Sequence, residues 1–389
     1  MFRAVTNWGL LAGAVALTVG SVLPAQAADQ GWQSASGPVS AGSSVLQDFA
    51  VTGPRELWAV GSQGEGPDGK NRPLAARYDG RSWRSFPVPD SGGHGLYAVS
   101  AAGRELWATR RVANSADVLH FDGRKWAARP VANEDGETAI WGVKAFGPRD
   151  VWVAGGVFRD KKSRAVLQHF DGRSWKSFPV PVGQAVNALL FSLDGTGPSD
   201  LWAVGGSGEA GKGRPLALHW NGRDWRQVPV PTTGPNNDLI TVDIVNGRPI
   251  ATGLSGYQPP SDGTARSAQV VRRPAARKAV ANPNEKPLAY QWNGRAWVAQ
   301  QLPVANGLLW SASPDGRGGA WAVGQQAGSK PLVLRFDGRA WNRADIEASV
   351  DQGVLYGVAT LATGESVAGG TVGRFDSEDG PGVFLRYGR

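Results

Sequence analysis

The chain has 389 residues, no cysteine and a formal net charge of +8, with 54 glycines and 17 tryptophans. The lack of cysteine excludes disulfide bonds and a cysteine nucleophile, so stability must come from core burial, which a chain of this length can provide. The positive excess is moderate, and we expect no specific nucleic-acid partner.

Residues 1–27 have the pattern of a secretory signal peptide. Arg3 precedes the apolar run LLAGAVALTVGSVL, and PAQA ends in the small-x-small pattern that signal peptidase reads. We therefore expect cleavage after Ala27, secretion to the extracellular space, and one domain over residues 28–389. The apolar run is short for a membrane span, so we expect none; an uncleaved signal anchor is the alternative.

Short phrases then recur along the chain. The first reads RELWAVGS at 55–62 and returns as RELWATR, RDVWVAGG, SDLWAVGG and GAWAVGQ, with degenerate copies at 248–254 and 365–371. The second joins an aromatic residue to Asp-Gly-Arg or Asn-Gly-Arg and then a Trp, as in YDGRSW. A strand-like run such as GLYAVSA precedes each copy of the first phrase. Each unit thus predicts four short strands, which we name a to d in chain order.

Four strands in a unit of about 40 to 50 residues are typical of a β-propeller blade. Asp-Gly or Asn-Gly between strands c and d predicts a type I′ hairpin turn, and Gly-Arg or Gly-Pro-Arg marks the a–b turn. Strand c can be counted seven times by its last aromatic residue, at Tyr78, Phe121, Phe170, Trp220, Trp292, Phe336 and Tyr387. The sequence therefore predicts an all-β, seven-bladed β-propeller with four-stranded antiparallel blades.

The seventh unit ends at Arg389, before its Trp. The segment GWQSASGPV, residues 31–39, carries a Trp followed by a strand that ends at Pro and Val, like strand d of the other units. We therefore expect the N-terminal segment to supply strand d of the last blade. This pairing would close the ring and remove its exposed sheet edges.

The DGRSW and LWAVG phrases resemble those of secreted actinobacterial seven-bladed propellers. They are also distantly similar to the Asp-box of sialidase-type propellers, which has a residue between Asp and Gly and a Ser before the Asp. Here Asp79 and Gly80 are adjacent. The resemblance covers the chain after residue 27 and implies the fold only, because propellers host many unrelated functions.

Most of the conspicuous residues belong to the repeat. His120, His169 and His219 share one strand-c position in consecutive blades, too far apart to ligate one ion, so we expect no metal and no cofactor. Fourteen tryptophans recur in strands b, c and d, where we expect packing between blades: Trp32, Trp58, Trp83, Trp107, Trp126, Trp152, Trp175, Trp202, Trp220, Trp225, Trp292, Trp297, Trp321 and Trp341.

An arginine also recurs in each c–d turn. These arginines either form a ring that binds a polyanion or lie over the neighbouring Trp: Arg81, Arg124, Arg173, Arg223, Arg295, Arg339 and Arg389.

One position in strand a is the candidate ligand site. It holds Gln47, Tyr97, Trp141, Phe191, Ile240, Trp310 and Tyr356. The candidate binding residues are those at this position other than Ile240, together with His94, which lies on a d–a loop near Tyr97. Strand a is the innermost strand of a propeller, so these residues can form a stacking platform at the mouth of the channel, on the side of the b–c and d–a loops. Packing between blades is the alternative.

The b–c loop of the fifth blade, residues 257–286, is far longer than its counterparts and holds six basic against two acidic residues. It is a tolerated insertion, a protease-sensitive segment, or a loop that binds an anionic surface or partner. In the last case the binding residues would be Arg266, Arg272, Arg273, Arg277 and Lys278.

Common catalytic motifs such as GxSxG, HExxH and the phosphate loop are absent. Asp48 and Asp243 lie on strands a, where they can act as an acid pair only if both open into one pocket. We therefore expect an exported, monomeric, non-catalytic binding protein, whose leading ligand is carbohydrate or cell-wall glycan. The alternatives are a secreted glycosidase or lyase and a protein-docking scaffold.

Overall fold

The computed structural model describes residues 31–39, 43–65, 71–89, 95–112, 115–160, 162–182, 187–209, 212–256, 284–347, 349–372 and 380–388. The expected signal peptide, His94 and the five basic residues of the blade-five loop lie outside the described residues. The described residues form strands and turns without a helix, and so without one that could span a membrane.

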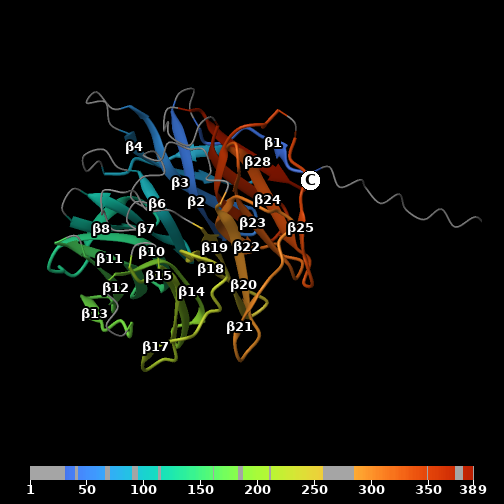
Figure 1. Ribbon diagram of the computed structural model, residues 1–389. Helices are drawn as coiled ribbons and strands as arrows, with labels where there is room; N and C mark the ends of the chain where they lie inside the picture. Colours follow the sequence, from blue (N-terminus) through green and yellow to red (C-terminus); the bar gives the residue numbers. More distant parts are fainter. Residues whose placement is uncertain are drawn as a thin grey trace, which may run out of the picture. The chain divides into compact units, whose positions relative to one another are not determined.

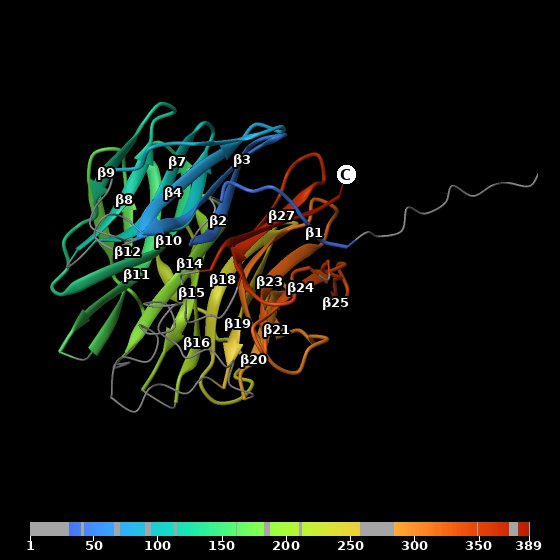
Figure 2. The same cartoon turned by 90° about the horizontal axis from the view of Figure 1, so that it is seen from above.

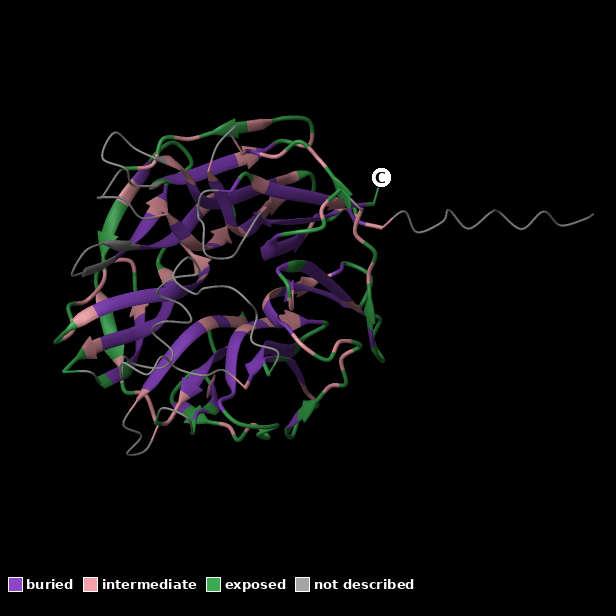
Figure 3. Cartoon of the chain, turned by 45° about the horizontal axis from the view of Figure 1, so that its top comes forward, coloured by how far each residue is buried: buried purple, intermediate pink, exposed green. Residues whose placement is uncertain are grey.

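Seven four-stranded antiparallel sheets make up the fold (Figure 1). The first strand of each sheet contacts the first strand of the next, and that of the last sheet contacts that of the first, so the sheets form a closed ring (Figure 2). Buried residues lie within and between the sheets, and exposed ones at the turns and the rim (Figure 3). The predicted seven-bladed β-propeller is thus confirmed.

The strands follow the predicted order a to d in every blade. Blade 1 contains β2 (Ser44–Gly53), β3 (Glu56–Glu65), β4 (Asn71–Tyr78) and β5 (Trp83–Ser85); blade 2 contains β6 (Leu96–Ala102), β7 (Glu105–Val112), β8 (Ser115–Phe121) and β9 (Trp126–Pro130). Blade 3 contains β10 (Glu137–Gly147), β11 (Asp150–Arg159), β12 (Lys162–Phe170) and β13 (Trp175–Phe178); blade 4 contains β14 (Ala188–Gly197), β15 (Asp200–Ser207), β16 (Arg214–Trp220) and β17 (Trp225–Gln227). Blade 5 contains β18 (Asp238–Val245), β19 (Arg248–Ser255), β20 (Lys286–Trp292) and β21 (Trp297–Ala299). Blade 6 contains β22 (Leu308–Pro314), β23 (Ala320–Gln326), β24 (Lys330–Phe336) and β25 (Trp341–Arg343); blade 7 contains β26 (Val354–Thr360), β27 (Ser366–Thr371), β28 (Gly382–Tyr387) and β1 (Gln33–Ser34).

The repeated tryptophans pack between neighbouring blades, as predicted. The strand-b Trp of one blade contacts the strand-c aromatic and the strand-d Trp of the next. Trp202 of blade 4, for example, lies 4.9 Å from Trp292 and 5.1 Å from Trp297 of blade 5, measured between ring centroids. All five strand-b tryptophans are at most 3% exposed. Burying a large aromatic surface at each junction is what holds the ring together.

The three strand-c histidines are separate structural units. Each stacks on the strand-b Trp of its own blade, and its Nε2 is hydrogen-bonded to the acid at the start of strand b. In blade 3, His169 lies 4.5 Å from Trp152 between centroids and 2.8 Å from Asp150 Oδ1. Arg335 takes the same place in blade 6, over Trp321 and beside Asp315. The histidines therefore tie strand b to strand c within their own blades.

The c–d turns differ from the predicted type I′ turns. In blade 1, Tyr78 pairs with Trp83, so the turn has four residues, and only Gly80 has a positive φ, of 91°. Asp79 Oδ1 accepts hydrogen bonds from the backbone N–H groups of Arg81 and Ser82, at 2.8 and 2.9 Å. The prediction was wrong because the Asp side chain caps the turn, which removes the need for positive φ at two positions.

The N-terminal segment closes the ring in the predicted way. Gln33 pairs with Arg386, and Ser34 with Leu385, next to the end of the chain. Trp32 is fully buried, with its ring centroid 5.1 Å from that of Trp321 and 5.7 Å from that of Tyr387. The regular strand is only two residues long, shorter than the expected 31–39, but Trp32 fills the strand-d position that the last blade lacks.

Candidate functional site

Each strand a carries a β-bulge at one level of the channel. In blade 3, Ile140 pairs with Gly155 and Gly142 with Ala154, so Trp141 is the extra residue. The same irregularity falls on Gln47, Phe191, Ile240, Trp310 and Tyr356, and on Tyr97 together with Ala98 in blade 2. A bulge re-aims the side chains around it. The seven residues at this strand-a position, which are six of the candidate binding residues and Ile240, are therefore all bulge residues; we call them the bulge ring.

The glycine in the LWAVG phrase makes room for this bulge. A Cβ on Gly155 would lie 2.0 Å from the carbonyl oxygen of Ala139 on strand a, and one on Gly205 would lie 1.9 Å from that of Leu189. Four of the five remaining blades meet the same condition with a glycine at this place in strand b. Blade 2 has Arg110 instead, and its bulge takes in two residues. The close approach of strand a to strand b therefore requires glycine.

The channel holds a cavity of about 340 Å³. Its wall begins at the bulge ring and continues toward the a–b turns, as far as Val51 and Thr360. The described lining therefore lies on the a–b side of the ring. We had expected the site on the side of the b–c and d–a loops. A cavity of this size is at the lower end of those that hold small ligands.

The bulge ring packs partly on itself. Trp141 and Phe191 lie 5.5 Å apart between ring centroids, and Trp310 and Tyr356 lie 5.8 Å apart. Trp141, Phe191, Ile240 and Tyr356 are buried, whereas Gln47, Tyr97 and Trp310 are half-buried. All seven line the cavity. That they bind a ligand remains a prediction.

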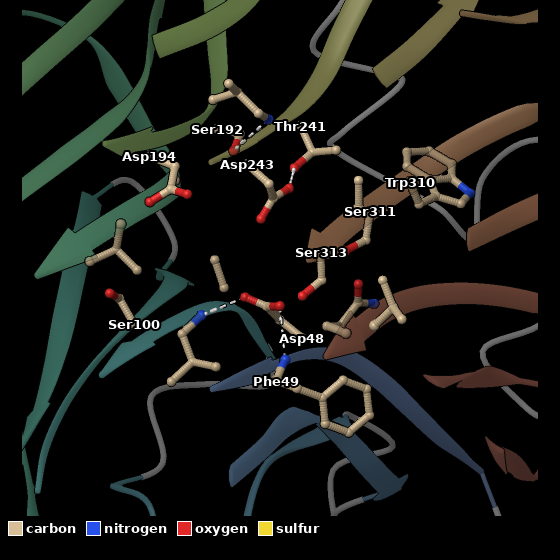
Figure 4. Close-up of a pocket in the computed structure, with 18 of the residues that line it drawn as sticks. Asp48, Phe49, Ser100, Ser192, Asp194, Thr241, Asp243, Trp310, Ser311 and Ser313 are labelled. Carbon is tan, nitrogen blue, oxygen red and sulfur yellow. Dashed lines mark hydrogen bonds between the residues drawn. The ribbon is translucent and has the colours of Figure 1, made fainter. Parts of the chain in front are cut away.

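Three carboxylates point into the cavity. Figure 4 shows Asp48 of β2 on one side and Asp194 of β14 and Asp243 of β18 on the opposite side. In a ring of seven blades, blade 1 lies opposite blades 4 and 5, which explains why these side chains face one another. Asp48 and Asp243 therefore do share one pocket, the condition for the acid-pair alternative. The sequence had not pointed to Asp194, although it holds the same place after the bulge as Asp243.

Burial raises the pKa of Asp48 to about 7. Two backbone N–H groups partly offset this effect: Asp48 Oδ1 accepts from Phe49 at 2.8 Å, and Oδ2 accepts from Val99 of the next blade at 2.9 Å. Desolvation outweighs these bonds because the carboxylate lies deep in the channel and none of the described residues places a cation beside it. Asp48 is thus about half protonated near neutral pH.

The pKa of Asp243 is also raised well above its usual value. Burial is the main cause, and the negative charge of Asp194 adds to it. A hydrogen bond of 3.0 Å from Thr241 Oγ1 to Asp243 Oδ2 acts in the opposite direction. Asp194 itself has a cation: Lys144 Nζ lies 2.5 Å from its Oδ1. The cavity therefore holds one carboxylate that is paired with a lysine, Asp194, and two carboxyl groups whose neutral form is favoured, Asp48 and Asp243.

Other polar groups of the wall join neighbouring blades. Asp194 Oδ2 accepts a hydrogen bond of 2.9 Å from the N–H of Ile244, and Ser100 Oγ accepts one of 3.0 Å from the N–H of Ala145. Ser311 and Ser313 also line the cavity (Figure 4). Hydroxyl groups can both donate and accept. The described residues contain no cluster of three or more histidine or acidic side chains that could hold a metal ion.

Neither a family model nor a curated protein matches the chain. Solved structures do. YCF48 from Cyanidioschyzon merolae is 15% identical, with a TM-score of 0.53 over 92% of this chain and 98% of that one. The β-propeller domain of the trilobed protease from Pyrococcus furiosus is 10% identical, with a TM-score of 0.54 over 89% and 94%. An ulvan lyase solved with a bound saccharide is 11% identical, with a TM-score of 0.53 over 90% and 96%.

At these identities the likeness concerns the fold alone. The three proteins differ in function, so the class that they define with this chain is the β-propeller and not a shared activity. The Pyrococcus propeller is described as having an open velcro topology. The present ring is instead closed by the pairing of β1 with β28.

Proposed function

We propose that the protein is an exported binding module that takes an uncharged, hydroxyl-rich part of a glycan into its channel. The observation that carries the proposal is the set of carboxyl groups facing one another across the cavity. A neutral carboxylic acid donates one hydrogen bond and accepts others, which matches sugar hydroxyl groups. An anionic ligand would be repelled by whichever of Asp48 and Asp243 is ionised, while Lys144 already compensates the charge of Asp194.

The half-buried bulge residues support a sugar ligand. Trp310 and Tyr97 line the same cavity as the carboxyl groups. Aromatic rings offer an apolar face with large contact area, against which a sugar ring can pack while its hydroxyl groups meet the polar wall. The cavity volume of about 340 Å³ suits a short saccharide segment.

Titration of the full chain with neutral oligosaccharides, chosen by a glycan array, tests the proposal. We expect Asp243→Asn and Trp310→Ala each to weaken binding by about tenfold or more, as loss of one well-placed hydrogen bond or contact would. Asp351→Asn, at an exposed position, is the matched control and should bind normally. Absence of binding to the array and to cell walls, with Trp310→Ala affecting only stability, would reject the glycan.

A secreted acid–base enzyme is the second candidate. Its supporting observation is that Asp48, with a pKa of about 7, shares a cavity with Asp243. A carboxylic acid that stays protonated near neutral pH is suited to donate a proton to a leaving group. New reducing ends or unsaturated products from neutral polysaccharides, lost in both Asp48→Asn and Asp243→Asn, would favour the enzyme. Binding without turnover would reject it.

Protein docking remains the third candidate. The structure of YCF48 bound to a D1 peptide, 15% identical with a TM-score of 0.55, is an example of a propeller with a peptide ligand. If this function holds here, a defined protein should co-purify with the full chain from culture medium, and neutral oligosaccharides should not displace it.

A further inference from the structure

A second surface lies at the end of the blades that carries the a–b and c–d turns. Strands alternate in direction, so both turns lie at the same end of each sheet. The structure describes eleven arginines in these turns, spread over six of the seven blades. All are exposed: Arg55, Arg104, Arg149, Arg248 and Arg317 in a–b turns, and Arg81, Arg124, Arg173, Arg223, Arg295 and Arg339 in c–d turns. We call this set the arginine face.

In blades 1 and 3 the arginine of the a–b turn lies in contact with the c–d turn. A Cβ on Gly172 of the c–d turn of blade 3 would lie 2.6 Å from Cγ of Arg149 in the a–b turn, and one on Gly80 would lie 3.1 Å from Cβ of Arg55. The side-chain stems of Arg149 and Arg55 therefore rest on the turn glycines. The next residue after each glycine is again an arginine. In these two blades, two arginines thus share the tip of the blade.

The carboxylates at this end are engaged within the protein. Asp171 Oδ1 accepts the backbone N–H groups of Arg173 and Ser174 at 2.8 and 2.9 Å, and these bonds lower the pKa of Asp171. The acids at the start of strand b pair with a strand-c arginine or histidine, as Glu365 does with Arg386 at 2.6 Å. The negative charges of these carboxylates therefore interact with groups within the turns and sheets.

The arginines, by contrast, are directed to solvent. Among the described residues, Arg223 is the only one of the eleven with an ion-pair partner, Asp224 at 3.7 Å. Packing over a neighbouring Trp, the alternative for the c–d arginines, does not appear among the cation–π contacts of the described residues, which involve Arg84, Lys144, Lys176 and Arg335. The arginine face therefore offers charge that the fold itself does not use.

The arginine side chains and their arrangement around the ring limit the chemical class of the partner that can bind. The cations of this face are arginines, whose planar fork suits the paired oxygens of a phosphate. The groups are spread around a ring instead of converging on one pocket, which favours a polymer that contacts several blades at once. The neighbouring strand-d tryptophans are packed between blades, so they offer no stacking platform for nucleic-acid bases.

We propose that the arginine face binds a linear, base-free polyanion of phosphodiesters, of the poly(glycerol phosphate) kind. Binding at the arginine face does not depend on the channel, so the proposals for the two sites can be confirmed or rejected separately. Because each contact is a screened surface charge, one blade tip binds weakly and the polymer gains affinity by bridging several.

The test is fluorescence anisotropy of labelled poly(glycerol phosphate) with the full chain, between about 50 and 200 mM salt. The triple variant Arg81→Ala, Arg173→Ala, Arg339→Ala keeps the turn backbone, whose N–H groups make the capping bonds. The matched control removes the same charge at the opposite ends of the blades: Arg72→Ala, Arg214→Ala, Lys330→Ala, all exposed.

We expect the turn variant to lose about tenfold or more in affinity at the lowest salt, with a log–log salt slope shallower by about 2. The control should bind within about twofold of the wild type, and both should melt as the wild type does. Equal loss in both triples would show a dependence on net charge alone and overturn the proposal, as would absence of binding at low salt. Tighter binding of oligothymidylate that persists at high salt would also overturn it, in favour of a nucleic acid.

Discussion

Asp48 shows how one side chain serves two purposes in this ring. Its carboxylate accepts an N–H from its own strand and one from β6 of the next blade, so it connects two blades at the channel wall. It also faces the cavity, where burial makes the charged form unfavourable. Polar groups that brace the blades are therefore the same groups that a ligand would meet.

The pKa of Asp48 sets the direction of one stability effect. The folded protein holds this proton up to about pH 7, whereas the unfolded chain releases it near the usual aspartate pKa of 3.8. The folded state thus binds more protons between these values, so this contribution to stability is full below about pH 4 and is lost as the pH rises to 7. Asp243 acts in the same direction.

We therefore expect Asp48→Asn to flatten the pH dependence. Urea unfolding at pH 5 and pH 8 should show that the wild type loses more stability than Asp48→Asn over this interval. Asp351→Asn, exposed and away from the cavity, should follow the wild type. A pH dependence in Asp48→Asn identical to that of the wild type would mean that the carboxyl group titrates normally.

At the scale of the element, the strand-a bulge and the strand-b glycine form a unit. The bulge turns one extra side chain toward the channel, and the glycine lets the strand-a carbonyl group come close. Two residues of the LWAVG phrase thus have a structural role: its Trp fills the junction between blades, and its Gly accommodates the bulge.

Gly205→Ala tests this unit. The added Cβ would lie 1.9 Å from the backbone oxygen of Leu189, so a strand must shift, at a cost of about 1–3 kcal/mol in the free energy of unfolding. Gly197→Ala lies at the other end of the same strand pair, where no atom is within 4 Å of the new Cβ, and should be close to neutral. Chemical denaturation measures both. Similar values for the two variants would remove the steric explanation.

At the scale of the whole molecule, stability depends on the junction between the termini. The last blade obtains its fourth strand from residues more than 300 positions away in the sequence, and Trp32 fills the space against blade 6. Because each blade is held by its two neighbours, an open junction would expose the flanks of both blade 6 and blade 7.

Deleting residues 31–39 should therefore lower the melting temperature of the entire ring in one transition. Trp32→Ala should cost about 3–5 kcal/mol, the usual range for a buried Trp. Differential scanning calorimetry measures both, with Val298→Ala, at the exposed hydrophobic position, as a control. A deletion variant with an unchanged melting temperature would show that the closure is dispensable.

The amino-acid sequence by itself determined the number of blades, their strand order and the closure by residues 31–39. These features are readable because every blade repeats the same local pattern: a Trp, a Gly and an Asp-Gly turn at fixed spacing. The bulge ring was readable for the same reason, since its seven residues align with the repeat. The turn type was not, because a side-chain cap competes with the backbone turn that Asp-Gly alone favours.

The tertiary structure alone decided which side chains share the cavity. Asp48, Asp194 and Asp243 come from blades 1, 4 and 5, and nothing local to any of them indicates a partner across the ring. The raised pKa values of Asp48 and Asp243 follow from burial, to which the negative charge of Asp194 adds in the case of Asp243, and this environment exists only when the ring is closed. The repeat specifies each blade from its own residues, but the channel depends on all seven blades together, because every wall of the cavity belongs to a different part of the chain.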